Sequence, residues 1–273
     1  MIQATVPESI QLQKEIRLDQ PDNETSILKR LKEIADLNQC KWRSYIGMGY
    51  YNCITPAPIL RNIFENPGWT TPYTPYQAEI SQGRLESLLN FQTMVCDLTS
   101  LDIANASLLD EGTAAAEAMQ MCFRYHKEKR RKFLCSNNAH PQTTAIVKTR
   151  CEALGIKFEI FDGSKDVFDG VKPLTDQYNL AEYCGILVHY PDSNGNVDNL
   201  ESIVNLAKAT ETIVIAATDL LALTMVKPPG EYGQFCDIAI GTAQRFGMLF
   251  FFSFFLENDS FVHFILFCLC IDI

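Results

Sequence analysis

The segment "TIVIAATD" (residues 212–219) decides the fold class, because it is a continuous run of apolar, strand-forming residues that ends in a carboxylate. Two more buried strands are predicted at 184–192 and 236–243, and two shorter strands at 132–136 and 157–161. Helices are predicted between strands, at 140–155 and 200–210. Continuous apolar strands that alternate with helices are typical of a mainly parallel sheet covered on both faces. We therefore predict an α/β domain.

The amino-terminal part of the chain has a different composition. A short amphipathic helix is predicted at 24–37, and residues 44–84 are rich in Gly, Pro, Asn and aromatic residues. That composition favours irregular ordered loops around one short helix at 58–65. Helical periodicity returns at 84–99. We divide the chain into an arm with an ordered loop, a partial α/β domain and an apolar tail, at 1–83, 84–247 and 248–273.

The tail contains two apolar runs, 248–256 and 261–271, separated by "ENDS". A membrane-spanning helix needs about 20 mostly apolar residues. Glu257 and Asp259 would then lie near the centre of such a span, where acidic residues insert poorly. A membrane anchor is therefore disfavoured, and we expect an unnatural end to a longer domain.

Composition excludes several classes of protein. The chain has 273 residues and a formal net charge of −10, which argues against a nucleic-acid-binding protein. Its ten cysteines form no CxxC pair and no His/Cys cluster with zinc-ligand spacing, so we expect reduced thiols and no metal site. Glu8, Glu15 and Asp19 do not suit a mitochondrial transit peptide, so none is visible.

Ligands of parallel α/β sheets bind at the carboxyl ends of the strands, which draws attention to Thr113, His140, Asp219 and Arg245. Thr113 opens a helix after Gly112, where it could cap the helix or help to hold a phosphate. His140 follows a strand and could stack on a flat cofactor ring, or it could be a partly exposed loop histidine. His189 lies within a strand and is interpreted as a satisfied core histidine.

Asp219 ends a buried strand and needs a partner, since burying an unpaired carboxylate is costly. A protonated pyridine nitrogen, a helix N-terminus or a nearby arginine would each serve. Arg245 follows the strand at 236–243, in a region where a pyridoxal-phosphate enzyme needs a lysine, because a permanently charged guanidinium cannot form a Schiff base. No lysine occurs after Lys227.

Long strings in this sequence resemble the glycine cleavage system P-protein, a decarboxylating glycine dehydrogenase. They include "SYIGMGYYNCITPAPILRNIFENPGWTTPYTPYQAEISQGRLESLLNFQTMVCDLT", "ANASLLDEGTAAAEAM", "HPQT", "ATDLLALT", "KPPGEYG" and "DIAIGTAQRFG", and the likeness runs from about residue 6 to Gly247. The resemblance implies a fold-type I pyridoxal-phosphate domain, here incomplete, with a mainly parallel sheet behind a helical and loop arm. It also implies that Tyr73, Tyr76 and Gln77 lie near the working site of the complete enzyme.

The family's protein has two similar halves, and this sequence resembles the earlier part of the first. Thr113, His140, Asp219 and Arg245 are then expected to form a relic site without the Schiff-base lysine. Pyridoxal phosphate would be held by the other, lysine-bearing half. The implied activity is glycine decarboxylation with aminomethyl transfer to the lipoylated H-protein, in mitochondria of a eukaryote or in the cytoplasm of a bacterium. We expect a fragment that is inactive alone; the alternative is a non-catalytic partner or decoy for the lysine-bearing half.

Overall fold

The computed structural model describes residues 1–12, 14, 16–39, 42–43, 45–48, 54–69, 77, 79–80, 82–105, 108–232, 236–246 and 264–268. The chain divides into two compact units, Met1–Tyr45 and Ile46–Ile273. The first unit holds three short helical elements, α1 (Ile2–Thr5), η1 (Glu8–Ile10) and α2 (Glu24–Ala35). α2 begins at Asn23, whose side chain accepts a hydrogen bond from the Ser26 N–H, and none of its residues is buried. The amphipathic helix expected here is confirmed.

The second unit opens with the short helix α3 (Ala57–Ile59), which continues as a π-helical turn, η2 (Leu60–Phe64). Its longer helices are α4 (Arg84–Thr99), α5 (Glu111–Tyr125), α6 (Pro141–Ala153) and α8 (Glu201–Ala209), with the short α7 (Lys165–Phe168). Its strands are β1 (Ile103–Ala104), β2 (Lys132–Ser136), β3 (Lys157–Phe161), β4 (Tyr183–Tyr190), β5 (Ile213–Asp219), β6 (Ile238–Thr242) and β7 (Phe264–Cys268). Short 3-10 turns link them: η3 (Leu174–Asp176), η4 (Leu180–Glu182), η5 (Ala222–Thr224), η6 (Pro229–Glu231) and η7 (Gln244–Phe246).

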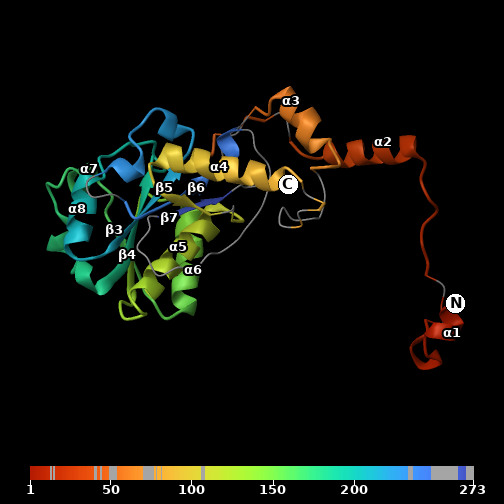
Figure 1. The fold of residues 1–273 in the computed structure, drawn as a ribbon, viewed down its shortest axis with the longest axis horizontal. Coiled ribbons are helices and arrows are strands. Elements are labelled where there is room, and N and C mark those ends of the chain that lie inside the picture. The colour runs from red at the N-terminus through yellow and green to blue at the C-terminus, as the bar shows by residue number, and fades with distance from the viewer. Residues whose placement is uncertain are drawn as a thin grey trace. The chain divides into compact units, whose positions relative to one another are not determined.

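The strands form one sheet in the order β1-β7-β6-β5-β4-β2-β3, and each described pair is parallel. Figure 1 shows helices on both sides of this sheet. One core lies against α5 and α6, and the other lies against α4, α7 and α8. The predicted parallel α/β arrangement is confirmed.

β5 shows why the strands had to be apolar throughout. Val214 and Ala216 pack in the core on the α8 side, whereas Ile213, Ile215 and Ala217 pack in the core on the α5 side. Alternate residues of a strand point to opposite faces, so a strand covered by helices on both sides needs apolar residues at every position. This is the physical basis of the "TIVIAATD" pattern.

β7 was not predicted, and it lies in the apolar tail. Its backbone pairs in parallel with β6 on one side and with β1 on the other, with Phe264 opposite both Ile238 and Ile103. A strand between two others satisfies its backbone donors and acceptors, which an apolar segment requires when it leaves water. In the part of the chain that is described, no helix has both the length and the apolar character needed to cross a bilayer.

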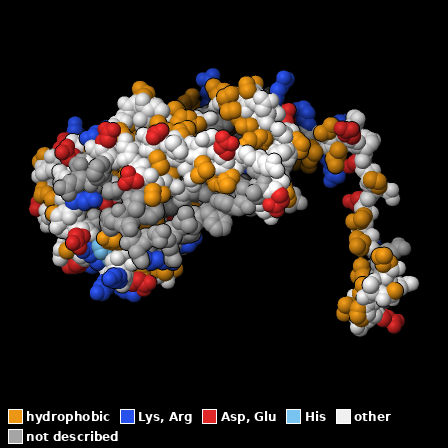
Figure 2. Space-filling model, viewed as in Figure 1, with side chains coloured by type: hydrophobic (Ala, Val, Ile, Leu, Met, Phe, Trp, Pro, Cys, Tyr) orange, Lys and Arg blue, Asp and Glu red, His pale blue; other side chains and the backbone are white. Residues whose placement is uncertain are grey.

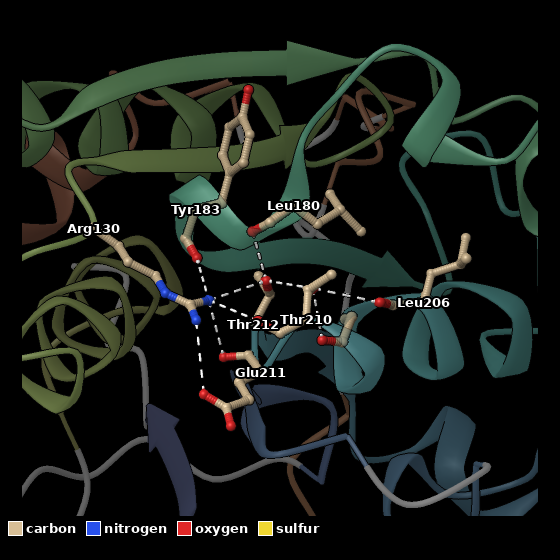
Figure 3. Close-up of polar contacts among 8 residues, drawn as sticks. Arg130, Leu180, Tyr183, Leu206, Thr210, Glu211 and Thr212 are labelled. Atoms are coloured by element: carbon tan, nitrogen blue, oxygen red, sulfur yellow. Dashed lines mark hydrogen bonds and ion pairs between the residues drawn. The ribbon is translucent and has the colours of Figure 1, made fainter.

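Arg130 ties three segments together at the amino-terminal edge of the sheet (Figure 3). Its Nη1 donates to the carbonyl oxygens of Tyr183, Thr210 and Glu211, at 3.3, 2.9 and 3.2 Å. Thr212 adds a hydrogen bond from its hydroxyl to the Leu180 carbonyl at 2.7 Å. The guanidinium therefore bonds a carbonyl group at the start of β4 and two carbonyl groups between α8 and β5. These bonds fix the spacing of the two segments.

Replacing Arg130 should destabilise the domain more than replacing its neighbour Arg131. Arg130→Ala removes this donor from the partly buried carbonyl groups of Tyr183 and Thr210, and we expect the free energy of unfolding to fall by about 2–4 kcal/mol. Arg131 lies over the Phe123 ring at 5.3 Å, so Arg131→Ala should cost about 1 kcal/mol or less. Urea denaturation measures both, and equal losses for the two variants would contradict this role for Arg130.

Candidate functional site

The carboxyl ends of β2, β4, β5 and β6 meet at one edge of the sheet, which we call the rim. Strand register sets the ends of β4, β5 and β6 side by side, with Tyr190 opposite Thr218 and Asp219 opposite Thr242. α5 begins at this edge and packs against the same strands. The rim therefore collects residues that lie far apart in the sequence.

At the start of α5, Asp110 and not Thr113 is the N-cap. The Asp110 carboxylate accepts a hydrogen bond from the Thr113 N–H at 2.6 Å. Gly112 has a packing role, since a Cβ there would lie 2.4 Å from Cδ1 of Ile146 on α6. The helix N-terminus that was one alternative for a phosphate site thus already has a carboxylate at its N-cap, and a second acid, Glu111, lies in its first turn.

The loop that carries His140 is held from both sides. Asn137 accepts the Gly163 N–H at 2.9 Å, and the Asn138 side chain donates to the Gly163 carbonyl at 2.6 Å. On the other side, the Ser193 N–H donates to the Asn138 carbonyl at 3.0 Å. These bonds join the loop after β2 to the loops after β3 and β4, so the His140 backbone has a fixed position.

His140 is buried, with 6% of its surface exposed, so the alternative of a partly exposed loop histidine is wrong. Its ring packs against His189, with ring centroids 3.9 Å apart, and its Nδ1 lies 2.8 Å from Ser193 Oγ. The His140 backbone N–H donates to His189 Nδ1 at 3.2 Å. His140 is buried because the loops after β3 and β4 close over the segment that carries it.

His189 has partners at both ring nitrogens, which confirms the interpretation as a satisfied core histidine. Nδ1 accepts from His140, so the proton of the neutral ring is on Nε2. Nε2 lies 3.5 Å from Glu111 Oε1, which also accepts from Thr143 Oγ1 at 2.8 Å. Glu111 received no role from the sequence, although two acids in succession before a glycine could have drawn attention to it.

Burial dominates the protonation of this cluster. It lowers the pKa of His189 to about 4, and together with the neighbouring His189 ring it lowers the pKa of His140 to about 4. Burial raises the pKa of Glu111. His140 and Thr143 partly offset this rise in pKa, and the charges of Asp110 and Asp219 add to it. Both imidazoles are therefore neutral at neutral pH.

The ligand atoms of Glu111, His140 and His189 lie within 4.8 Å of one another, a spacing that could suit a metal ion. The hydrogen bonds argue against that use. To ligate through Nε2, His189 would have to carry its proton on Nδ1, where it would face the His140 N–H as a second donor. The cluster is therefore built as a hydrogen-bonded stack and does not fit a metal.

Asp219 has a partner for each carboxylate oxygen. Oδ1 accepts the Leu221 N–H at 3.0 Å, and Oδ2 forms an ion pair with Arg245 Nη1 at 3.2 Å. Both side chains are largely shielded, with 18% and 28% exposed for Asp219 and Arg245. Of the partners considered for this carboxylate, the structure provides the nearby arginine.

The comparisons with known proteins now bear on this rim. The family model "Glycine cleavage system P-protein" matches residues 1–253. The chain belongs to this family. Mitochondrial glycine dehydrogenase (decarboxylating) of Homo sapiens is 50% identical over 248 residues, and the protein of Photobacterium profundum is 51% identical over 248 residues. Each alignment covers 91% of this chain. The chain spans about a quarter of the length of these relatives, 23% of the human protein and 24% of the bacterial one.

Solved structures support the fold assignment. A crystal structure of glycine decarboxylase, the P-protein, matches with a TM-score of 0.73 and 32% identity over 87% of this chain and 52% of that one. Glutamate decarboxylase of Lactobacillus brevis matches with a TM-score of 0.50 at 13% identity over 80% of this chain and 52% of that one, which shows the fold alone. The predicted fold-type I class is confirmed.

Membership of the P-protein family implies pyridoxal phosphate in the complete enzyme, but this rim does not fit that group. Arg245 follows β6 at this rim; its guanidinium cannot form a Schiff base, and it already forms an ion pair with Asp219. The Asp110 carboxylate already accepts the Thr113 N–H, one of the first-turn donors on which a phosphate would depend. The His140 ring packs against the His189 ring, with 52° between the ring planes.

The three residues predicted near the working site have different outcomes. Tyr73 and Tyr76 lie outside the described residues. Gln77 is exposed on the segment before α4. Their proximity to a working site stays a prediction.

The buried histidines predict a loss of stability in acid. Between about pH 6.5 and about pH 4 the unfolded chain protonates His140 and His189 while the folded chain does not, so stability is full above this window and falls as the pH drops through it. Each histidine contributes at most about 1.4 kcal/mol per pH unit. Glu111 acts in the opposite direction, because its raised pKa lets the folded chain take up a proton first.

His189→Gln should remove about one proton from this dependence and flatten the plot of unfolding free energy against pH. Urea denaturation at a series of pH values measures the slope. Lys148→Gln, on the exposed side of α6, is the control and should leave it unchanged. A His189→Gln slope equal to that of the wild type would refute the neutral, buried assignment.

Proposed function

We propose that this chain forms the first, cofactor-free part of a glycine decarboxylase of the glycine cleavage system. Its 50% identity to glycine dehydrogenase (decarboxylating) over 248 residues supports the assignment to that enzyme. The observation that carries the assignment to the non-catalytic half is the ion pair between Asp219 and Arg245. A guanidinium remains charged and cannot condense with an aldehyde, so the chain supplies no Schiff-base residue at the rim.

Thr113, His140, Asp219 and Arg245 are then a relic of a cofactor site. Each lies on an element that begins or ends at the rim, which supports a common origin with a working site. In the relic, Asp110 caps the helix, Arg245 pairs with Asp219, and His189 covers His140. The relic groups thus stabilise the rim through contacts with one another, as for Asp219 and Arg245, or with the neighbouring Asp110 and His189.

The complete enzyme would combine this part with a lysine-bearing half that holds pyridoxal phosphate. Glycine would be its substrate, and the lipoylated H-protein would accept the aminomethyl group. The relatives include mitochondrial and bacterial proteins, so we place the enzyme in mitochondria if the source is eukaryotic and in the cytoplasm if it is bacterial. Tyr73, Tyr76 and Gln77 are proposed to brace the working site from the loop before α4.

Reconstitution tests this proposal. The purified chain alone should catalyse no exchange between bicarbonate and the carboxyl group of glycine. Addition of a lysine-bearing half should give exchange above that of the half alone, because the added chain supplies its missing neighbour. Inhibition of the half would instead indicate a decoy, and exchange by the chain alone would refute the proposal.

Arg245→Lys provides a sharper test of the relic site. The new ammonium group should form the same ion pair with Asp219, which keeps it protonated and unreactive. We therefore expect no stoichiometric Schiff base after incubation with pyridoxal phosphate and borohydride, as measured by peptide mass spectrometry. Arg131→Lys controls for labelling of surface lysines, and stoichiometric labelling at position 245 would contradict the misfit of this rim.

A further inference from the structure

The turn between α5 and β2 concentrates positive charge in an acidic protein. Residues 124–132, "RYHKEKRRK", contain six of the 23 Lys and Arg residues and one acid. This stretch carries a net charge of +5, so the rest of the chain carries −15. It lies at the amino-terminal edge of the sheet, where β2 begins, and so at the edge opposite the rim.

Four cations of this turn have no carboxylate partner among the described residues. Arg124, Lys127, Lys129 and Arg131 are exposed, and we call them the basic turn. The other cations of the stretch are engaged, since Lys132 pairs with Glu182 and Arg130 pairs with Glu211. Acidic groups are abundant in this chain, yet none of those described pairs with these four side chains. The positive charge of this surface is therefore uncompensated.

Three other lysines of this domain show the contrast. Lys148 pairs with Glu152 on α6, Lys172 pairs with Asp166, and Lys208 pairs with Asp237. Ion pairing is therefore common on this domain, and the basic turn departs from it. Lys and Arg side chains gather at the lower left of Figure 2, the end of the domain at which this turn lies.

The backbone of the turn has an uncommon conformation and is anchored by hydrogen bonds on its carboxyl side. Lys127 and Glu128 have φ angles of 52° and 60°, in the left-handed region that non-glycine residues rarely occupy. On the carboxyl side of the turn, Arg130 Nη1 donates to the Thr210 carbonyl at 2.9 Å and Arg131 Nη1 donates to the Leu154 carbonyl at 3.4 Å. A fixed backbone lowers the entropy cost of binding, and strain of this kind is concentrated at functional segments.

We propose that the basic turn binds an acidic segment of a partner protein. A short run of Asp and Glu residues matches the size of the turn and can pair with its four cations. An extended polyanion such as a nucleic acid or an anionic membrane would also meet the remaining −15 charge of the chain, which repels it. This surface is independent of the proposed function, because it lies away from the rim.

Binding of a fluorescein-labelled oligoglutamate to the 273-residue chain tests the proposal by fluorescence anisotropy. We expect binding that weakens as salt rises from about 50 mM to about 500 mM, because exposed charges are screened. Lys127→Glu with Lys129→Glu should weaken it by about fivefold or more. Lys165→Glu with Lys172→Glu makes the same change in net charge at exposed sites on and after α7, and it should stay within about twofold.

Arg124→Glu is a second, independent variant on the helical side of the turn, and it should also weaken binding. Equal losses for the turn and control variants would overturn the proposal, since only net charge would then matter. Absence of binding would also overturn it. Tighter binding of an oligothymidylate, or of phosphatidylserine vesicles, at the same residues would replace the acidic protein with that class of partner.

Discussion

The ion pair between Asp219 and Arg245 is the constraint on which the chemistry of this rim depends. β5 delivers a carboxylate to the edge of the sheet after a strand that is apolar on both faces, and that carboxylate needs a positive partner. The structure supplies one from η7, directly after β6. Once the guanidinium is in place, the carboxylate needs no second cation, such as a protonated pyridine nitrogen.

The other rim residues follow the same principle. Asp110 accepts a hydrogen bond from the first turn of α5. In the buried histidine pair, His189 contacts Glu111 and His140 contacts Ser193. The polar groups of this rim are thus satisfied by neighbouring protein groups, as the proposed relic of a cofactor site requires. This explains how a fold-type I scaffold can keep its rim residues and lack the lysine, and why we assign bond-breaking to another half of the enzyme.

Much of the fold could be predicted, because β5 and β6 carry apolar residues at every position and the helices between strands have clear periodicity. The pairing of Asp219 with an arginine was among the predicted alternatives, because a buried carboxylate has few possible partners. The burial of His140 was not predictable, since it depends on loops around Gly163 and Ser193 that meet only in three dimensions. The same holds for β7, whose pairing with β1 and β6 cannot be inferred from an apolar run.

A double-mutant cycle on Asp219 and Arg245 tests the central claim most directly. Asp219→Asn, Arg245→Gln and the combined variant would be compared with the wild type in urea denaturation. The ion pair predicts a coupling free energy of about 1 kcal/mol or more, because both groups are shielded and share a hydrogen bond. Additive effects, with a coupling near zero, would show that the two side chains do not depend on each other and would contradict the account.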